Sequence, residues 1–382
     1  MPKFMRTFCQ RGYASRRGCV HLNRVLAASA ELYNAELELW RKQYEETGKS
    51  DSLYDRFKAF TALRNSDDFW MNLSVNVGRG VLFRMDQARQ VFHRRVRNGD
   101  EPGYPRFKPR NRYRTIQQEQ AGLGMVKPDR RGYALKIKGL PVIRLRTKVE
   151  LPPEENLKSI RITFKGRRIG VSLVYAVEIE PLPHNPARVG LDMGVLSRIT
   201  TSDGERIERR PVDRNELDGK QRRLSACKKG SNKYRKRRRI LANAHSRARV
   251  RDRNRCHEIT TDPVSRHGFI AVEKLAVRKM TASGGRRKAG LNRSINEQSW
   301  RRIVNQLLCK AAWAGRELVF VDPSYTSQIC SGCGARVKKS LSVRTHRCGC
   351  GLVLDRDHNA AINVLSRALG GGVLPPAVGE TA

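Results

Sequence analysis

The sequence predicts an α/β protein of several domains, because three stretches of its 382 residues carry three different hydrophobic periods. Residues 17–100 show the 3.6-residue spacing of amphipathic helices. Residues 106–183 alternate apolar and polar side chains, as strands with one buried face do. From residue 187 onward, short apolar strands alternate with helical stretches, which is the pattern of an α/β domain.

The chain carries a very large excess of positive charge, +41 from 77 Lys and Arg against 36 Asp and Glu. A folded protein with that excess repels itself unless a polyanion neutralises it, and nucleic acid is the obvious polyanion. We expect no membrane span, because no run of 18 or more apolar residues is present. The N-terminus lacks the apolar core of a signal peptide, so a reducing cytoplasm is the expected compartment.

The first half of the chain divides into a strand, a helical region and a sheet. Residues 1–15 predict a basic strand, and the helices that follow end at the turn RNGDEPGYPRF, whose prolines forbid further helix. The segment SIRITFKGRRIGVSLVYAVEIE predicts a β-hairpin, and PVIRLRTKVELP predicts another strand. Together these strands predict a small barrel or a curved sheet.

The second half predicts strands and helices in alternation. The segment RVGLDMGVLSRITTSDGERIERR predicts two strands, a tight Asp-Gly turn and a third strand, and RHGFIAVE predicts a buried strand. The stretch KMTASGGRRKAGLNRS has no periodicity, which predicts a mobile loop. An amphipathic helix begins at Trp300 and ends at Gly315, followed by the strand ELVFVDP. DRDHNAAINVLSRAL predicts a last helix, and GGGVLPPAVGETA a disordered tail.

Residues 216–260 predict a long basic helical stretch, broken near Gly230. An exposed structural helix is one interpretation. A solvated helix, however, usually interleaves both signs of charge, and this stretch has almost no acidic partners. We therefore expect nucleic-acid contacts from the basic side chains Arg235, Lys236, Arg237, Arg238, Arg239 and Arg247.

Three carboxylates stand out by their position. Asp192 lies in a strand between apolar neighbours, Glu273 ends a buried strand, and Asp357 begins the last helix. Singly, each has an ordinary explanation: a bulge residue, an ion pair and a helix cap. Together, their order along the strands and helices is that of an RNase H-like nuclease, in which two divalent ions bridge the carboxylates. Mg²⁺ suits such a site because it needs few protein carboxylates and keeps several waters.

Four cysteines form two close pairs, Cys330 with Cys333 and Cys348 with Cys350. Four thiolates suit one tetrahedral Zn²⁺, although the second pair is one residue short of C-x-x-C. His346 is a possible substitute ligand. The alternative, a redox dithiol, lacks a thioredoxin-like context, so the pattern favours a structural zinc.

Several motifs resemble the TnpB proteins of bacterial insertion sequences and the compact type V CRISPR effectors related to them. They are GLDMG, VEKL, VDPSYTSQICSGCG and LDRDHNAAINVL, with GYPRF and the Arg-rich helix in the expected places. The resemblance spans residues 1–367. It implies an RNA-guided DNA endonuclease in which a guide RNA pairs with the target and the protein reads a short flanking motif.

The resemblance also implies the site and the partners. The catalytic acids would be Asp192, Glu273 and Asp357, binding two Mg²⁺, with Asp355 in a supporting role and one structural Zn²⁺ on the cysteines. The partners would be a guide RNA and a double-stranded DNA target that forms an RNA–DNA heteroduplex. The expected form is a monomer with one RNA in a bacterial or archaeal cytoplasm. Two alternatives remain open: an RNA-guided DNA-binding protein that does not cut, and a transposase that transfers DNA strands.

The domain organisation implied by the resemblance has a RuvC-type nuclease domain of RNase H-like fold with a zinc-finger insertion. A β-barrel-like wedge domain and a helical recognition domain precede it. The expected ranges are wedge 1–15 and 103–184, recognition 16–102, nuclease 185–322 and 352–368, zinc-binding insertion 323–351 and disordered tail 369–382. Within the nuclease part, the basic helix is expected at 216–260 and a lid loop at 280–294.

Overall fold

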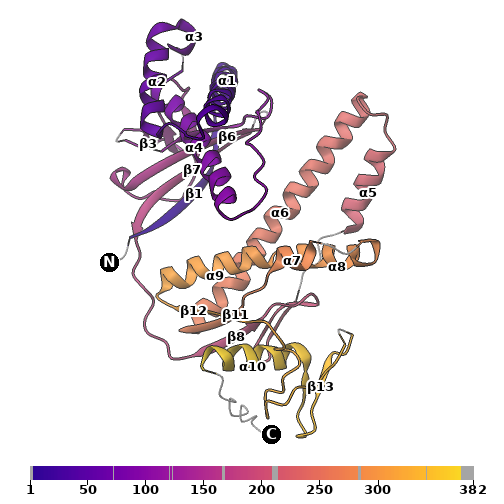
Figure 1. Cartoon of the computed structure of the whole chain (residues 1–382). Coiled ribbons are helices and arrows are strands. Elements are labelled where there is room, and N and C mark those ends of the chain that lie inside the picture. Colours follow the sequence, from indigo (N-terminus) through magenta and orange to yellow (C-terminus); the bar gives the residue numbers. More distant parts are fainter. Residues whose placement is uncertain are drawn as a thin grey trace. The chain divides into compact units, whose positions relative to one another are not determined.

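The computed structural model describes residues 3–71, 73–119, 121–122, 124–165, 168–208, 214–282, 285–340 and 342–370. The chain forms two compact units, Met1–Glu178 and Ile179–Ala382 (Figure 1). The predicted mixed α/β class is confirmed. The predicted tail beyond residue 370 lies outside the described residues, as does the 166–167 turn of the predicted hairpin. Within the described ranges, no helix is both long enough and apolar enough to cross a membrane.

The first unit contains a seven-stranded sheet in which all neighbouring strands are antiparallel, in the order β2-β6-β7-β1-β5-β4-β3. The first strand lies inside this sheet, between strands that come much later in the sequence. The predicted N-terminal strand and the predicted hairpin are both present. The strands are β1 (Lys3–Tyr13), β2 (Thr115–Gln118), β3 (Val126–Asp129), β4 (Gly132–Leu135), β5 (Ile143–Arg146), β6 (Leu157–Lys165) and β7 (Arg168–Glu178).

Four helices and the sheet of the first unit share one apolar core, which includes Trp40, Phe60 and Tyr175. Gly80 allows the close approach of α4 to the sheet, because a Cβ there would lie 1.9 Å from the carbonyl oxygen of Gln117. The four helices confirm the predicted helical region. The helices are α1 (Arg16–Thr47), α2 (Leu53–Ser66), α3 (Asp68–Met71) and α4 (Val75–Arg97), and the short 3-10 helix η1 (Glu154–Asn156) precedes β6.

The second unit is built on a five-stranded sheet in the order β10-β9-β8-β11-β12. Strand β11 is parallel to both β8 and β12, whereas β9 is antiparallel to β8 and β10. Helices α6 and α9 pack on one face of this sheet, and α10 packs on the other (Figure 1). The elements are β8 (Arg188–Asp192), β9 (Ser197–Thr201), β10 (Arg206–Glu208), β11 (Phe269–Glu273), β12 (Glu317–Val321), α6 (Asn232–Arg266), α9 (Trp300–Ala314) and α10 (Arg356–Ala368).

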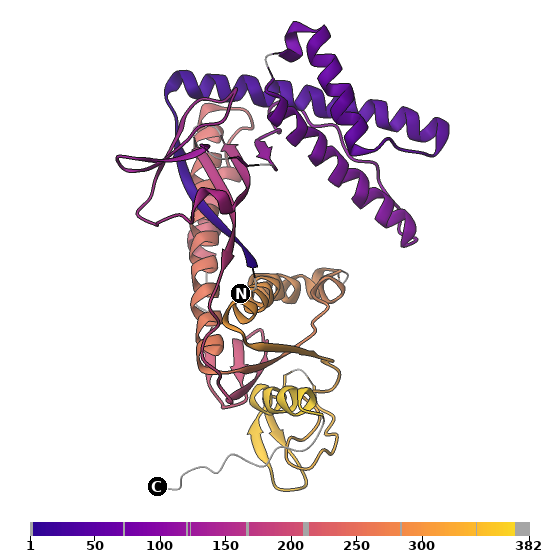
Figure 2. The ribbon, with the colours of Figure 1, turned by 90° about the vertical axis from the view of Figure 1, so that its left-hand side faces the viewer.

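A helix and a short hairpin add to this unit. Helix α5 (Arg214–Ser225) packs on α6, and the chain turns between them at Gly230, whose φ of 86° is easy only for glycine. This is the predicted break in the basic stretch. A short hairpin of β13 (Thr345–Arg347) and β14 (Val353–Asp355) lies beside α10; both are yellow in Figure 2.

The segment 280–294, predicted as a loop, is mostly helical, and that prediction is wrong. Helices α7 (Val277–Thr281) and α8 (Gly285–Glu297) occupy this part of the chain. Ile295 of α8 is buried against Met193 and Trp300. A helix with so few apolar positions gives a weak periodic signal, and here its stability comes from tertiary packing.

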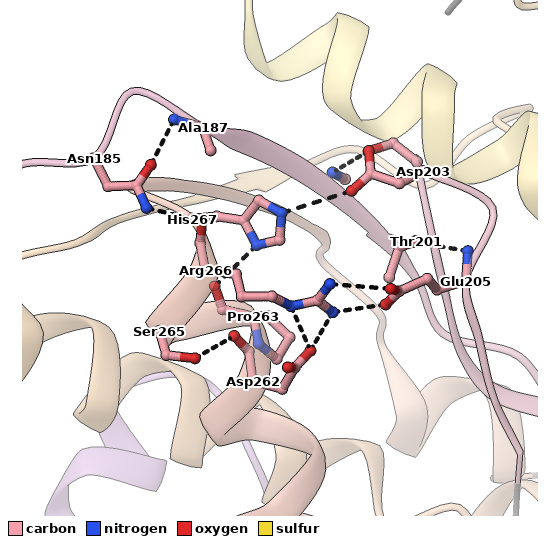
Figure 3. Close-up of polar contacts among 12 residues, drawn as sticks. Asn185, Ala187, Thr201, Asp203, Glu205, Asp262, Pro263, Ser265, Arg266 and His267 are labelled. Carbon is pink, nitrogen blue, oxygen red and sulfur yellow. Dashed lines mark hydrogen bonds and ion pairs between the residues drawn. The ribbon is translucent and has the colours of Figure 1, made fainter. Parts of the chain in front are cut away.

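A polar cluster fixes the end of α6 to the edge of the sheet where the parallel strands begin (Figure 3). Arg266 donates two hydrogen bonds to Glu205, at 3.0 and 2.6 Å, and also bonds Asp262. Asn185 donates to the Arg266 carbonyl at 2.9 Å and accepts from the backbone N–H of Ala187 at 2.8 Å. These contacts hold the entry to β8 beside the entry to β11. They lie at the start of the two strands that carry the buried acids.

Candidate functional site

Two of the predicted acids end neighbouring parallel strands. Asp192 is the last residue of β8 and Glu273 is the last residue of β11. The strands are in register, with Leu191 opposite Val272, so both acids emerge at the same edge of the sheet. Both side chains belong to buried residues, 9% exposed for Asp192 and 5% for Glu273. The carboxyl edge of a parallel sheet is the usual place for a ligand in an α/β fold.

The third acid reaches this edge on α10. Helix α10 crosses β8 at Gly190, where a Cβ would lie 2.2 Å from the carbonyl oxygen of Ala361. Asp355 caps the helix by accepting hydrogen bonds from the backbone N–H groups of Asp357 and His358. Asp357 Oδ2 lies 3.6 Å from the position that a Cβ on Gly194, two residues beyond Asp192, would take. Asp192, Glu273 and Asp357 are called the acid trio below.

The surroundings of the acid trio disfavour the ionised form of all three carboxyl groups. Burial, and then the carboxylates of Glu273 and Asp357, raise the pKa of Asp192 well above its usual range. Burial also raises the pKa of Glu273, against the hydrogen bond from Thr326. The pKa of Asp357 is raised by burial and by Asp355, against three arginines, Arg344, Arg356 and Arg206. Carboxylates that repel one another in a buried place are stabilised by a bound cation.

The trio is looser than a closed metal site. In the described part of the chain, only the four cysteines form a group of three or more candidate ligands whose donor atoms all lie within 4.8 Å of one another. The trio's oxygens therefore do not all meet that limit. Mg²⁺ commonly takes one or two carboxylates and completes its shell with water and phosphate oxygens. The all-carboxylate donor set is of the chemical kind that Mg²⁺ prefers.

Thr326 holds Glu273 in place through a contact that we did not predict from the sequence. Its hydroxyl donates a 2.6 Å hydrogen bond to Glu273 Oε1. The same residue's carbonyl oxygen accepts a 2.8 Å bond from Asn363 of α10. One short turn therefore joins the strand with the second acid to the helix with the third. The T-S-Q triplet before the first cysteine is the available signal, but only the fold pairs it with Glu273.

Arg344 is a second residue that the sequence analysis did not single out. Its Nη1 lies 3.9 Å from Asp357 Oδ1, and its side chain is 47% exposed. Arg344 comes just before β13, on the segment that contains the cysteines. A partly exposed guanidinium beside a carboxylate can also bind a phosphate at the same place. The separation of Arg344 and Asp357 along the sequence does not indicate that their side chains meet.

The four predicted zinc ligands come together. Cys330 Sγ lies 3.7 Å from Cys350 Sγ, and Cys333 Sγ lies 3.5 Å from Cys348 Sγ. Around a tetrahedral zinc with Zn–S bonds of about 2.3 Å, sulfur atoms are about 3.8 Å apart. The quartet therefore fits this ion. The short second pair closes because Gly351 adopts a φ of 89° and donates its N–H to the Cys348 carbonyl.

His346, the possible substitute ligand, is not part of this group. Its side chain is fully buried and its Nδ1 contacts Lys339 Nζ. The group of candidate ligands found among the described residues consists of the four cysteines. His346 is therefore a buried residue of the β13–β14 hairpin and not one of the candidate metal ligands.

The predicted nucleic-acid contacts lie on α6. Five of the six are consecutive, and four of these line a surface hollow with Ala242. Arg247, further along the helix, is exposed, with Nη2 3.9 Å from a Glu216 oxygen. The four lining residues are Arg235, Lys236, Arg238 and Arg239, while Arg237 is half-buried.

Two known proteins that resemble this chain in sequence are both named as putative RNA-guided DNA endonucleases. A protein of Streptomyces pristinaespiralis named "Putative RNA-guided DNA endonuclease" is 31% identical over 98% of this chain and 93% of its own length. The protein of Escherichia coli K12 named "Putative RNA-guided DNA endonuclease InsQ" is 32% identical over 74% of this chain and 71% of its own length. The chain belongs to the TnpB-like family of RNA-guided DNA endonucleases. The family predicted from the sequence motifs is therefore confirmed.

Two family models match parts of this TnpB-like chain. The model described as "Cas12f1-like, TNB domain" covers residues 300–364, and the model described as "Probable transposase" covers residues 172–284. Mimivirus proteins named TnpB-like, such as L79, are 28% identical over 36% of the chain and 27% of their own length. These matches cover both the cysteine segment and the strands of the first two acids.

Solved structures share the fold. The chain aligns with the protein of a Cas12f1–sgRNA–target DNA complex with a TM-score of 0.59 and 13% identity, over 95% of this chain and 98% of that one. It aligns with the mini-RNA-guided endonuclease CRISPR-Cas_phi3 with a TM-score of 0.51 and 10% identity, over 98% of this chain and 94% of that one. At these identities the likeness shows the fold alone.

Proposed function

We propose that this chain is an RNA-guided DNA endonuclease. It binds a guide RNA, recognises a short motif beside the target, and hydrolyses DNA phosphodiester bonds at the acid trio. The observation that carries the proposal is the meeting of three carboxylates at one sheet edge, in a member of a family named for this activity. The net charge of +41 supports two polyanionic partners.

The acid trio is the proposed place of Mg²⁺-dependent cleavage. Asp192, Glu273 and Asp357 would hold two ions, and Thr326 would keep Glu273 in the orientation that binding needs. What divalent ions supply in such a site is activation of the attacking water and neutralisation of charge on the leaving oxygen. Arg344 would hold a non-bridging oxygen of the phosphate beside Asp357. Burial of Asp192 and Glu273 strengthens the charge interactions at these two acids.

The four cysteines are the proposed site of one structural zinc. A segment of this size cannot build its own apolar core and needs a cross-link to fold. Cys330 sits next to Ser331, whose backbone N–H donates to Asn359 of α10 at 3.0 Å. Zinc would therefore fix the segment that carries Arg344 against the helix that carries Asp357.

The proposed domain layout follows the family. Residues 185–322 and 352–368 would form a RuvC-like nuclease domain, with 323–351 as its zinc-binding insertion. The sheet and the helices of the first unit would form the wedge (1–15 and 103–184) and recognition (16–102) domains. The basic residues of α6 would contact the phosphates of the guide RNA or of the heteroduplex, because phosphate contacts need charge and exposure rather than base readout. The expected form is a monomer with one RNA, acting in a prokaryotic cytoplasm.

A cleavage assay tests this function. The protein is purified with the RNA that copurifies from its host locus, that RNA is sequenced, and matched duplex DNA is supplied with Mg²⁺. We expect cutting of the matched DNA by the parent protein and none of an unmatched duplex or by Asp357→Ala. Equal cutting by Asp357→Ala would refute the proposed catalytic residues.

Strand transfer is the second candidate, because the model described as "Probable transposase" matches residues 172–284. RNase H-like folds carry both chemistries. Products in which the supplied DNA end is joined to a second duplex would support it. Binding to matched DNA with neither cleavage nor joining would instead support an RNA-guided binding protein.

A further inference from the structure

Tyr325, on the turn between β12 and the first cysteine, combines a strained backbone with an exposed ring. Its φ is +62°, in the left-handed region that bulky residues rarely adopt. Its side chain is 51% exposed. Among the described residues, Ser299 is the other non-glycine with a positive φ. Backbone outliers of this kind persist where the surroundings impose them, and they cluster at functional sites.

The surroundings do impose this conformation. The carbonyl oxygen of Tyr325 accepts a 2.9 Å hydrogen bond from the backbone N–H of Gln328. The next residue, Thr326, is fixed on two sides, by its hydroxyl bond to Glu273 and by the Asn363 bond to its carbonyl. The turn is therefore anchored to both the sheet and α10. Anchored in this way, it directs Thr326 inward and leaves the ring of Tyr325 in solvent.

One face of the ring is covered by a cation. The guanidinium carbon of Arg336 lies 3.6 Å from the ring centroid of Tyr325. Arg336 is itself held by a 3.1 Å hydrogen bond from its Nε to Gln328 Oε1. The segment 323–351 contains five Lys and Arg residues and no Asp or Glu. A rigid aromatic ring in a basic segment is the combination with which proteins stack unpaired nucleobases.

We propose that Tyr325, backed by Arg336, is a stacking platform for one unpaired base of the DNA strand being cut. The proposal rests on the endonuclease function proposed above. Consecutive Cα atoms are about 3.8 Å apart, and the residue after Tyr325 bonds Glu273. The platform therefore stands beside the acid trio. Because every base has an aromatic face, the platform would position the strand without selecting its sequence.

Fluorescence of 2-aminopurine tests the stacking. The probe is a matched duplex target with 2-aminopurine at successive positions of either strand. The probe is bound to the full chain with its copurified RNA, in an Asp357→Ala background that prevents cutting. We expect quenching at one position, or at two neighbouring positions, of one DNA strand. The quenching should survive Tyr325→Phe and disappear in Tyr325→Leu and in Tyr325→Asn, since asparagine tolerates the left-handed backbone.

Abasic substitution tests the consequence for cleavage. In the chain with an intact acid trio, removing the base at the quenched position should slow cutting about tenfold, the size of one lost stacking contact. In Tyr325→Leu the rate should already be reduced by a similar factor, and removing the same base should cost nothing further. A ring that served only the folding of the hairpin would show no such coupling to one base.

The outcomes separate cleanly. The platform would be overturned if Tyr325→Leu and removal of the base slowed cleavage independently at every DNA position. It would also be overturned if 2-aminopurine stayed quenched in both Tyr325→Leu and Tyr325→Asn. Neither result would contradict the endonuclease function. Quenching from 2-aminopurine placed in the RNA, and from neither DNA strand, would overturn the assignment to DNA. If Tyr325→Leu loses zinc or melts early, Tyr325→Asn decides in its place. If the parent does not bind matched DNA at all, the proposed function falls, and the platform falls with it.

Discussion

The second unit holds two clusters of candidate metal ligands, the four cysteines and the acid trio, and they are assembled in opposite ways. The four thiols already stand 3.5 and 3.7 Å apart in pairs, as a tetrahedral ion requires. The three carboxylates are spread more widely. Burial raises the pKa of each of them, and repulsion by the other two acids further raises the pKa of Asp192. The four thiols alone can complete a tetrahedral shell, whereas the acid trio does not form so compact a group of donor atoms. This is the contrast expected between the structural and the catalytic metal site proposed above.

The largest effect expected from this comparison is at Asp357. Asp357→Asn should reduce DNA cleavage by about 10²–10³-fold, the loss that follows removal of one preorganised charge-stabilising group. Its control is Asp355→Asn, two residues earlier, because asparagine still caps α10. The measurement is single-turnover cleavage of matched DNA by both variants. An equal loss in the two variants would mean that negative charge at the start of α10, and not the carboxylate of Asp357 itself, is what cleavage requires.

The thiol cluster should respond through folding rather than chemistry. Cys333→Ser should remove the bound zinc, from about one ion per chain to about none. It should also loosen the segment that carries Arg344, so that cleavage falls as a consequence. Zinc content by mass spectrometry and amide hydrogen exchange over 323–351 measure these effects. Cys309→Ser, at an exposed cysteine outside the cluster, is the control, and a zinc loss of equal size there would contradict the assignment.

The acid trio depends on how closely α10 lies on β8. Gly190→Ala places a Cβ 2.2 Å from the Ala361 carbonyl oxygen, so the helix must move. We expect a loss of about 1–3 kcal/mol in the free energy of unfolding and a weaker cleavage activity, since Asp357 moves with the helix. Gly219→Ala, where no atom lies within 4 Å, is the matched control. Denaturant melts of the two variants distinguish them, and equal stability would show that the close packing is not required.

Replacing Arg344 should slow cleavage less than replacing Asp357, the acid that it faces. Arg344→Ala should slow cleavage about tenfold, equal to about 1.4 kcal/mol of transition-state stabilisation, while zinc content stays unchanged. Arg347→Ala, at an exposed arginine of the same hairpin, controls for the loss of one positive charge. If both variants slow cleavage to the same degree, Arg344 contributes only to the general charge of the hairpin.

Local sequence patterns predict most of the helices and strands. They do not predict contacts between side chains that only the fold brings together. Asp192 is recognisable in the sequence because it lies in a strand between apolar neighbours, and Glu273 because it ends a short apolar strand. The cysteines are recognisable by their spacing. Arg344 and Thr326 were not, since their partners lie on other elements. Helix α8 has a weak periodic signal in the sequence, because its few apolar residues, such as Ile295, are accounted for only by their packing in the fold.

The resemblance in the motifs predicted the family before any fold was known. It did not say how the acids come together. That arrangement depends on the register of β8 and β11 and on the glycine that lets α10 approach. Both are properties of pairs of elements, which a single sequence does not display.

The most direct test of the central claim is the thermal stability of the RNA-free protein with and without Mg²⁺. A carboxyl group whose pKa is raised on folding stabilises the protein below its unfolded value, near pH 4. That stability is lost as pH rises through the folded value. Without divalent ions, the parent should therefore lose stability over this range more steeply than Asp192→Asn. At neutral pH, Mg²⁺ should raise the melting temperature of the parent and leave that of the Asp192→Asn, Asp357→Asn double variant unchanged. An equal rise in both proteins would contradict a shared cation site at the acid trio.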